Sequence, residues 1–358
     1  MIRRVPVVVA LCLVAASPPA QDELPAAAHA PADAARARLD PARTRALERG
    51  LRRLAALQDE GGSWPAATGA PHATLAVTGA SLLALLGGGS TMRQGPHRAA
   101  IKNGIRWLRD QQRDDGAFLD LQHPGAAAVQ ALATTAMIEA FTLSNYTLLK
   151  KNCTRGLSRL AALRHTDGGW RTAPDEPDPG ATLWAVTAFE SARLAALPLP
   201  DQALDGVDAW LAGAAAAQVP EIGVLGAPAP RGREPVLREE QVAAVLFSRA
   251  LRAGLGTGDT AQDDLARLRS TTWTWSDGAS LYQRFCAAHA LALAGGDHGA
   301  ADAAALAAMG DGVAAAQRDD GSWPATDLWA PVGGEAWTTA MAALVLEAPF
   351  RYALGRGR

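Results

Sequence analysis

Apolar residues follow two patterns that alternate along the chain. In the segment from about residue 41, Leu47, Leu51 and Leu54 fall three or four positions apart, which is the period of an amphipathic helix packed on a core. The next segment, from Pro71 to Gly87, is apolar on nearly all sides and therefore predicts a buried helix. Because the same pair of patterns recurs, we expect amphipathic outer helices to alternate with apolar inner helices.

A short polar turn that carries an aromatic residue follows most of the amphipathic segments, and we call it the clasp. Its clearest copy reads Gln-Arg-Asp-Asp-Gly-Ser-Trp from Gln317 to Trp323. The acidic residue and the glycine are typical of a tight turn at a helix C-terminus, and the aromatic ring is expected to cover that turn. Glutamine can satisfy backbone groups left open at the helix end. The residues assigned to clasps are Gln58, Gly62, Trp64, Gln112, Gly116, Phe118, Gly169, Trp170, Trp275, Gln317, Gly321 and Trp323.

The spacing of the clasps predicts the fold. Their aromatic positions are separated by 54, 52, 105 and 48 residues, and the 105-residue step equals two periods. A repeat of this length indicates an array whose units bury their apolar faces against each other. Six units are implied, the fourth with a degenerate clasp, and no segment alternates long enough for a strand. We expect an all-α (α/α)6 toroid, a closed double ring of six helical hairpins, over residues 43–350.

The N-terminal segment has the pattern of an export signal. Residues 1–20 begin with Arg3 and Arg4, continue as a short apolar run and end in Ser-Pro-Pro-Ala. Cleavage near Ala20 is expected, with an uncleaved anchor as the alternative. Residues 21–42 are rich in Ala and Pro and predict a linker, and residues 351–358 a C-terminal tail. We therefore expect an exported, periplasmic or extracellular protein without a later membrane span.

Composition narrows the classes of partner. The 358 residues are 49% hydrophobic and 20% charged, with a net charge of -2. This balance suits one large core, and without a basic stripe to neutralise phosphates no nucleic-acid partner is expected.

Of the three cysteines, Cys12 lies in the leader, and Cys153 and Cys286 lie two units apart. That separation predicts two unpaired, buried thiols.

The clasp repeat resembles a known superfamily. The stretches from Gly50 to Trp64 and from Gly104 to Phe118 are similar to the repeat of squalene and terpene cyclases and of protein prenyltransferase β-subunits. The resemblance implies the toroid fold, but the Asp-x-Asp-Asp acid of the squalene–hopene cyclases is absent. Asp277, Cys286 and His289 fall in one unit without reproducing the order of the prenyltransferase zinc ligands. We therefore expect no metal and no cofactor.

Polysaccharide lyases and glycosidases share the double-ring shape, and their chemistry needs a base or a pair of carboxylates. Polar residues at the starts of the inner helices should meet at one mouth of the ring, although solvated loop charges and helix caps account for the same pattern. The candidates at this mouth are Asp175, Glu176, Asp178, Arg238, Glu239, Glu240, Tyr282, Arg284 and Glu335. As ligand-binding residues we select Asp178, Arg238, Glu239, Tyr282 and Glu335.

Two classes of function stay open. The first is an exported toroid without catalysis that binds a small apolar or glycan ligand, or a protein partner, because both sets of catalytic residues are missing. The second is an enzyme, either an isoprenoid cyclase with a divergent acid or a polysaccharide lyase. The aromatic residues expected on inner helices are few for polycyclisation: Trp184, Phe189, Tyr282, Phe285 and Trp337. A central pocket of several hundred Å³ lined with aromatic rings would favour the enzyme.

Overall fold

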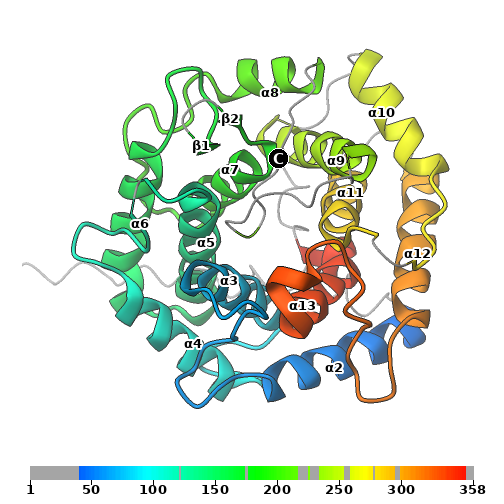
Figure 1. The fold of residues 1–358 in the computed structure, drawn as a ribbon, viewed down its shortest axis with the longest axis horizontal. Coiled ribbons are helices and arrows are strands. Elements are labelled where there is room, and N and C mark those ends of the chain that lie inside the picture. Colours follow the sequence, from blue (N-terminus) through cyan, green and yellow to red (C-terminus); the bar gives the residue numbers. More distant parts are fainter. Residues whose placement is uncertain are drawn as a thin grey trace, which may run out of the picture.

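The fold is a double ring of helices (Figure 1). The computed structural model describes residues 40–120, 122–173, 176–216, 225, 234–253, 259–276, 279–294 and 299–351. The outer ring consists of α2 (Pro41–Ala56), α4 (Arg98–Gln111), α6 (Lys150–Ala162), α8 (Val207–Ala216), α10 (Asp259–Ser270) and α12 (Gly299–Ala315). The inner ring consists of α3 (Pro71–Gly87), α5 (Ala126–Ser144), α7 (Pro179–Leu194), α9 (Glu234–Ala253), α11 (Leu281–Ala294) and α13 (Ala330–Arg351).

Both rings close on themselves. Each inner helix packs on the inner helices before and after it, and α13 packs back on α3. In the outer ring α12 contacts α2, so the last unit covers the first. The six helical hairpins and the all-α class predicted from the sequence are confirmed. Closure leaves no exposed end of the array.

The clasp tryptophans bind the preceding outer helix through their indole N–H groups. Trp64, Trp170 and Trp323 are fully buried and donate to the carbonyls of Leu54, Leu160 and Val313, at 2.7, 2.8 and 2.7 Å. Each of these acceptors lies ten residues earlier, in the last turn of its helix, where the regular series of helical hydrogen bonds ends. The aromatic ring therefore caps the helix while it fills the core.

The clasp glutamines tie each unit to the next outer helix. Gln58 donates to the carbonyl of Gly62 in its own turn and to that of Ala100 in α4, both at 2.9 Å. Gln112 makes the equivalent pair of bonds to Gly116 and to Asn152 of α6, at 3.2 and 3.1 Å. The side chain therefore acts as a bridge between consecutive units.

The last clasp closes the ring on α2. Gln317 donates to the carbonyl of Ala46 at 2.8 Å, and Gly321, at φ 87°, lies against the backbone of Arg49. The Trp323 ring lies over Gly50, where an added Cβ would approach it to 2.5 Å. A glycine in α2 thus makes the space for an aromatic ring that lies 273 residues later in the chain.

In two clasps, a neighbouring residue that the sequence assignment did not name takes the role of the turn glycine or of the capping tryptophan. In the third unit the left-handed turn residue is Gly168, at φ 104°, whereas Gly169 takes the next position and lies against Trp210. In the fifth unit Trp273 is buried and donates to the carbonyl of Leu268 at 3.3 Å. Trp275 is half-buried, and its N–H has no partner among the described residues. The reason is that α10 ends at Ser270, so the nearer tryptophan reaches its last turn.

Other boundaries shift slightly. A two-stranded antiparallel ladder, β1 (Arg171–Ala173) with β2 (Glu176–Pro177), follows the third clasp and is too short to produce an alternating pattern. A short 3-10 helix, η2 (Thr147–Leu149), precedes α6. Gly334 marks a kink within α13, at φ 74°.

Arg351, assigned to the tail, is the last residue of α13, and its side chain is buried. Its guanidinium pairs with Glu347 and with Glu139 of α5, both at 2.7 Å. It also donates to the carbonyl of Leu83 in α3 at 2.8 Å. This cluster joins the C-terminal ends of three inner helices, so the ordered ring extends to the predicted start of the tail.

The remaining expectations concern membranes and thiols. α5 is long and apolar enough to cross a membrane, but 83% of it is buried inside the ring, as expected for a core helix. Cys153 and Cys286 are free and buried, as predicted. Residues 1–39 and 352–358 lie outside the described part of the chain, so the leader, the cleavage site and most of the linker and tail remain predictions.

Ring closure by Trp323 predicts the effect of one added methyl group. Gly50→Ala places a Cβ against the Trp323 ring, and we expect it to lower the free energy of unfolding by about 1–3 kcal/mol through overpacking. Gly213→Ala in α8 is the matched control, because a Cβ there meets nothing within 4 Å and alanine stabilises a helix by about 0.5–1 kcal/mol relative to glycine. Urea denaturation of both variants measures the difference. Equal stabilities would contradict the packing described.

Candidate functional site

The inner helices all begin at the same end of the ring, and four of these beginnings carry a buried polar cluster. Asp178 precedes α7 and is fully buried, and its carboxylate caps the helix by accepting the N–H of Ala181 at 2.9 Å. Pro179 takes the first helical position, where its missing N–H costs no hydrogen bond. The remaining members come from α9, the start of α11 and the start of α13.

Glu240 of α9 lies at the centre of this cluster. One carboxyl oxygen, Oε1, accepts the hydroxyl of Ser280 and the indole N–H of Trp329, the latter at 3.0 Å. The other oxygen, Oε2, is buried and has no hydrogen-bond partner among the described residues. Burial raises the pKa of the Glu240 carboxyl to about 8, and the charges of Asp327 and Asp178 act in the same direction. Glu240 is therefore a neutral carboxylic acid at pH 7.

Asp327 lies just before α13 and accepts three hydrogen bonds. They come from the backbone N–H of Leu281 at 2.6 Å, the backbone N–H of Trp329 at 3.1 Å and the indole of Trp337 at 3.2 Å. Burial raises the pKa of Asp327 to about 6, which leaves it ionised at pH 7. Neither Asp327 nor Glu240 forms an ion pair with a described Lys or Arg side chain. At pH 7 Glu240 is thus a neutral acid and Asp327 an anion.

Tyr282, which interacts electrostatically with Glu240 and Asp178, belongs to a cluster of aromatic rings. Trp184 stacks on Phe285 with ring centroids 5.3 Å apart and an interplanar angle of 18°, and Tyr282 lies 6.1 Å from Trp184. Phe247 meets Phe285 edge-on at 5.5 Å. All four side chains are at most 1% exposed, so they form a dry environment beside the acid.

Two polar groups in this aromatic shell lack nitrogen or oxygen partners among the described residues. They are the indole N–H of Trp184 and the hydroxyl of Tyr282, which contacts only the thiol of Cys286. Burial raises the pKa of Tyr282 well above its usual value, so the phenol stays neutral. The Trp184 indole N–H is therefore a buried donor without a described partner, whereas the Tyr282 hydroxyl is held by Cys286.

Arg284 supplies the positive charge nearest to the cluster. It is buried, donates to the carbonyls of Trp273 and Thr274, and lies over the Trp273 and Trp275 rings at 5.8 and 5.9 Å. Burial lowers its pKa, and the charge of Asp327 opposes this shift. The guanidinium thus balances part of the negative charge without neutralising a carboxylate directly.

The structure brings together only some of the ligand-binding residues selected from the sequence. Asp178 and Tyr282 belong to the cluster. Arg238 is exposed, and Glu239 points to the outer ring, where it lies 3.7 Å from Arg267. Glu335 bonds to Arg53 of α2 at 2.7 Å and so supports ring closure. These three residues therefore lie outside the cluster.

Some of the other residues expected at the mouth belong to the cluster, and others do not. Glu240 and Arg284 were expected at the mouth and lie there, whereas Asp175 and the side chain of Glu176 fall outside the described part of the chain. Asp327 was missed, although it precedes α13 as Asp178 precedes α7. Comparing the residues that precede each inner helix would have found it.

The metal set considered from the sequence does not assemble in the described residues. Asp277 lies outside them, and no group of three or more described His, Cys, Asp and Glu side chains is arranged to hold a metal. The His289 Nδ1 bonds to the carbonyl of Phe285 at 2.8 Å, and burial lowers the pKa of His289 to about 3. Burial also raises the pKa of the Cys286 thiol well above its usual value. Both side chains are neutral at pH 7.

Comparison with known proteins defines the fold. No family model and no curated protein matches the sequence. A type II terpene cyclase, MstE from Scytonema, solved with geranylgeranyl dihydroxybenzoate, superposes with a TM-score of 0.58 at 11% identity over 87% of this chain and 98% of the cyclase. The chain therefore has an α/α toroid fold like that of this cyclase.

Two further solved structures share this fold. An inactive variant of an alpha-1,6-mannanase from Salegentibacter sp. HEL1_6, solved with alpha-1,6-mannotetrose, gives a TM-score of 0.60 at 10% identity over 87% of this chain and 99% of the mannanase. A protein from Actinoplanes gives 0.52 at 19% identity over 87% and 99% of the two chains. At these identities the likeness extends to the fold alone.

The raised pKa of Glu240 predicts how stability depends on pH. Below about pH 4.5 the carboxyl is protonated in both states, and between pH 4.5 and 8 the folded state keeps a proton that the unfolded state has lost. Stability therefore falls across this window by up to about 1.4 kcal/mol per pH unit. Glu240→Gln cannot titrate, so we expect its stability relative to wild type to rise from pH 5 to pH 8 in urea denaturation.

Glu239→Gln is the control for this experiment. It removes the adjacent carboxylate, which is half-exposed and faces Arg267. We expect this variant to keep the wild-type pH dependence. A Glu240→Gln variant that followed wild type at every pH would show that Glu240 is ionised in the folded protein.

Proposed function

We propose that this protein is an enzyme that starts its reaction by protonating an apolar, alkene-bearing substrate of the isoprenoid class, with Glu240 as the acid. The observation that carries the proposal is the asymmetry of the Glu240 carboxyl. Its Oε1 accepts two hydrogen bonds, and its buried Oε2 has no described partner. The proton of the neutral acid therefore resides on an oxygen that can donate it to a ligand.

The bonds to Oε1 support proton transfer. When Glu240 gives up its proton, the negative charge spreads over both oxygens, and the donors Ser280 and Trp329 already point at one of them. Preorganised donors of this kind stabilise a developing anion without rearrangement. They make the acid stronger than burial alone would allow.

The surroundings suit the cation that protonation of an alkene produces. The faces of Trp184, Tyr282 and Phe285 offer electron density to a carbocation. The ionised Asp327 adds a negative charge close to Glu240. The terpene cyclase with a similar fold was solved with a geranylgeranyl-bearing substrate, which is the class of ligand proposed for this chain.

A glycan is the second candidate substrate, and the division between the two carboxyl groups favours it. A neutral acid at a pKa of about 8 beside an ionised group at about 6 is the arrangement used for general acid and base work on a glycosidic bond. The mannanase of similar fold was solved with a mannotetrose. Burial of the rings at this mouth makes an apolar substrate the better match.

A third possibility is the binding module expected from the sequence, a toroid without catalysis. Its support is the near-complete burial of the cluster, since Asp178, Glu240 and Tyr282 have no exposed surface in this structure. A substrate reaches them only if this end of the ring opens. Export through the leader in residues 1–20 is likewise a proposal, supported by its basic start and apolar run.

The enzyme proposal is tested with geranylgeranyl dihydroxybenzoate and squalene in deuterated buffer. Protonation of an alkene transfers one solvent-derived deuteron to carbon, and loss of a proton from the final cation restores neutrality. We expect a cyclised product with one deuteron, detected by mass spectrometry. Because the acid must be protonated, the rate should fall as pH rises above about 8. Glu240→Gln should lower it by roughly 100-fold or more.

Glu239→Gln is again the matched control and should keep the wild-type rate, because its carboxylate lies outside the cluster. Alpha-1,6-mannotetrose is assayed in parallel. If wild type cleaved the mannotetrose and Glu240→Gln did not, the substrate would be a glycan. Binding of either ligand without turnover, unchanged in Glu240→Gln, would favour the module without catalysis.

A further inference from the structure

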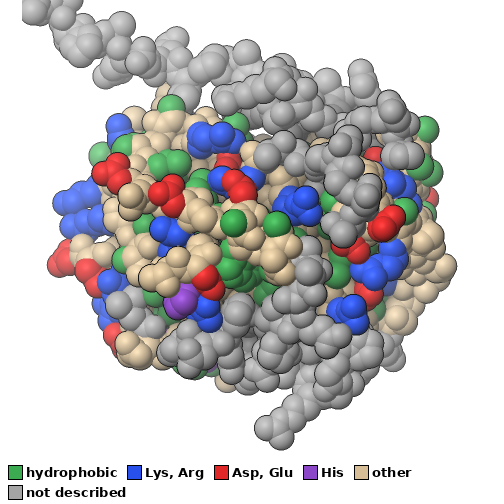
Figure 2. All heavy atoms as spheres, turned by 90° about the horizontal axis from the view of Figure 1, so that it is seen from above, with side chains coloured by type: hydrophobic (Ala, Val, Ile, Leu, Met, Phe, Trp, Pro, Cys, Tyr) green, Lys and Arg blue, Asp and Glu red, His purple; other side chains and the backbone are tan. Residues whose placement is uncertain are grey.

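Basic side chains are concentrated on one outer helix of a nearly neutral protein. On the face shown in Figure 2, acidic and basic side chains are interspersed. Along α4, in contrast, Arg98, Lys102, Arg106 and Arg109 recur every three or four residues, and Arg93 precedes the helix. The expectation that no basic stripe exists is therefore wrong, because the net charge of the chain conceals a local excess.

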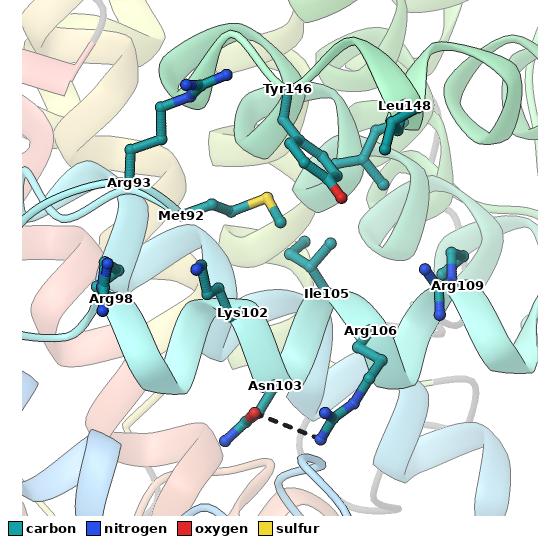
Figure 3. A pocket seen from close by; sticks show the side chains of 11 residues that line it. Met92, Arg93, Arg98, Lys102, Asn103, Ile105, Arg106, Arg109, Tyr146 and Leu148 are labelled. Atoms are coloured by element: carbon teal, nitrogen blue, oxygen red, sulfur yellow. Dashed lines mark hydrogen bonds between the residues drawn. The ribbon is translucent and has the colours of Figure 1, made fainter.

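These side chains border a cavity of about 650 Å³ on the outer wall, away from the aromatic cluster (Figure 3). The buried side chains of Met92, Ile105 and Leu149 supply apolar lining. Tyr146 and Leu148, which lie at and beside η2, face α4 across the cavity, and Leu148 is 73% exposed. The site thus combines an apolar lining with a cationic rim. It is not the central aromatic pocket that was considered from the sequence.

Two of the basic side chains at the rim of the cavity have no partner among the described residues. The guanidinium of Arg93 is held by the carbonyls of Ser144 and Asn145, and Arg109 pairs with Asp110 at 2.9 Å. The side chains of Arg98 and Lys102 are exposed and make no hydrogen bond or ion pair with the described residues. They stand one helical turn apart on α4, so both can reach the same anion.

We propose that this cavity, which we call the α4 pocket, binds a small molecule with an anionic head and an apolar body, such as an alkyl phosphate. Arg98 and Lys102 would hold the anion by charge-assisted hydrogen bonds, and Arg93 would add positive charge at the same end. Met92, Ile105, Tyr146 and Leu148 would cover the apolar body. A cavity of this volume matches a small-molecule ligand.

The shape and exposure favour a single molecule over a membrane surface. The ligand would enter a concavity, whereas insertion into a bilayer requires a projecting apolar face. Leu148 and Leu194 are the exposed large hydrophobic residues among the described ones, and Leu194 lies at the end of α7. One leucine beside the rim does not form an apolar patch.

Calorimetric titration of the full chain with decyl phosphate, below its micelle concentration, tests this proposal. We expect saturable binding that weakens at higher ionic strength, and much weaker binding of inorganic phosphate, which lacks the apolar body. In the double variant Arg98→Gln/Lys102→Gln the dissociation constant should rise by roughly tenfold or more. Leu148→Ser should weaken decyl phosphate binding and leave the binding of inorganic phosphate unchanged.

Arg45→Gln is the matched control, since Arg45 is an exposed arginine of α2 that does not line the α4 pocket. It should leave the affinity unaltered, and thermal unfolding should be the same for every variant because the substituted side chains are exposed. Equal binding of neutral decyl maltoside would overturn the requirement for an anion. Binding only to phosphatidylglycerol vesicles, with no binding of the monomer, would replace the pocket by a membrane surface. Failure of decyl phosphate to bind would also overturn the proposal.

Discussion

The contact between the last clasp and the first outer helix determines the rest of the structure. Gln317 and Trp323 reach across the join to α2, where Gly50 leaves room for the indole ring. In the inner ring α13 packs on α3 across the same join, so every inner helix has two inner neighbours. At the mouth, residues from the third, fourth and sixth units meet inside this ring. Asp178, Glu240 and Asp327 are such residues.

Charged side chains are buried at both ends of the inner ring. The two ends use buried carboxyl groups in opposite ways. At the C-terminal end Arg351 pairs with Glu347 and Glu139, which offsets the cost of burying charge. At the mouth Glu240 and Asp327 have no such partner, and their pKa values rise to about 8 and about 6. The first arrangement holds helices together, and the second leaves a proton available for transfer.

Much of the fold follows from the sequence because it depends on local, repeated signals. Helix periodicity and the clasp interval are sufficient to predict six hairpins, and the buried thiols follow from the separation of Cys153 and Cys286. The misplaced clasp at Trp275 shows the limit of this approach. Two tryptophans lay within reach, and the end of α10 selected the nearer one.

The site was less predictable, since it depends on directions that a sequence does not encode at single-residue resolution. Glu239 and Glu240 are adjacent and chemically identical, yet consecutive helical side chains point about 100° apart. One faces Arg267 in the outer ring and the other faces the closed centre. Asp327 lies in a loop without a regular period. The basic residues of α4 were visible in the sequence, but averaging charge over the whole chain concealed them.

The central claim is that Glu240 is a neutral carboxylic acid inside the ring at pH 7. Infrared spectroscopy tests it directly, because the C=O stretch of a protonated carboxyl is separate from the bands of a carboxylate. Comparison of wild type with Glu240→Gln at pH 7 should show one protonated-carboxyl band that is lost in the variant, and in wild type this band should disappear as pH rises past about 8. If Glu240→Gln instead lost a carboxylate band at pH 7, Glu240 would be ionised, and the account of the site would be wrong.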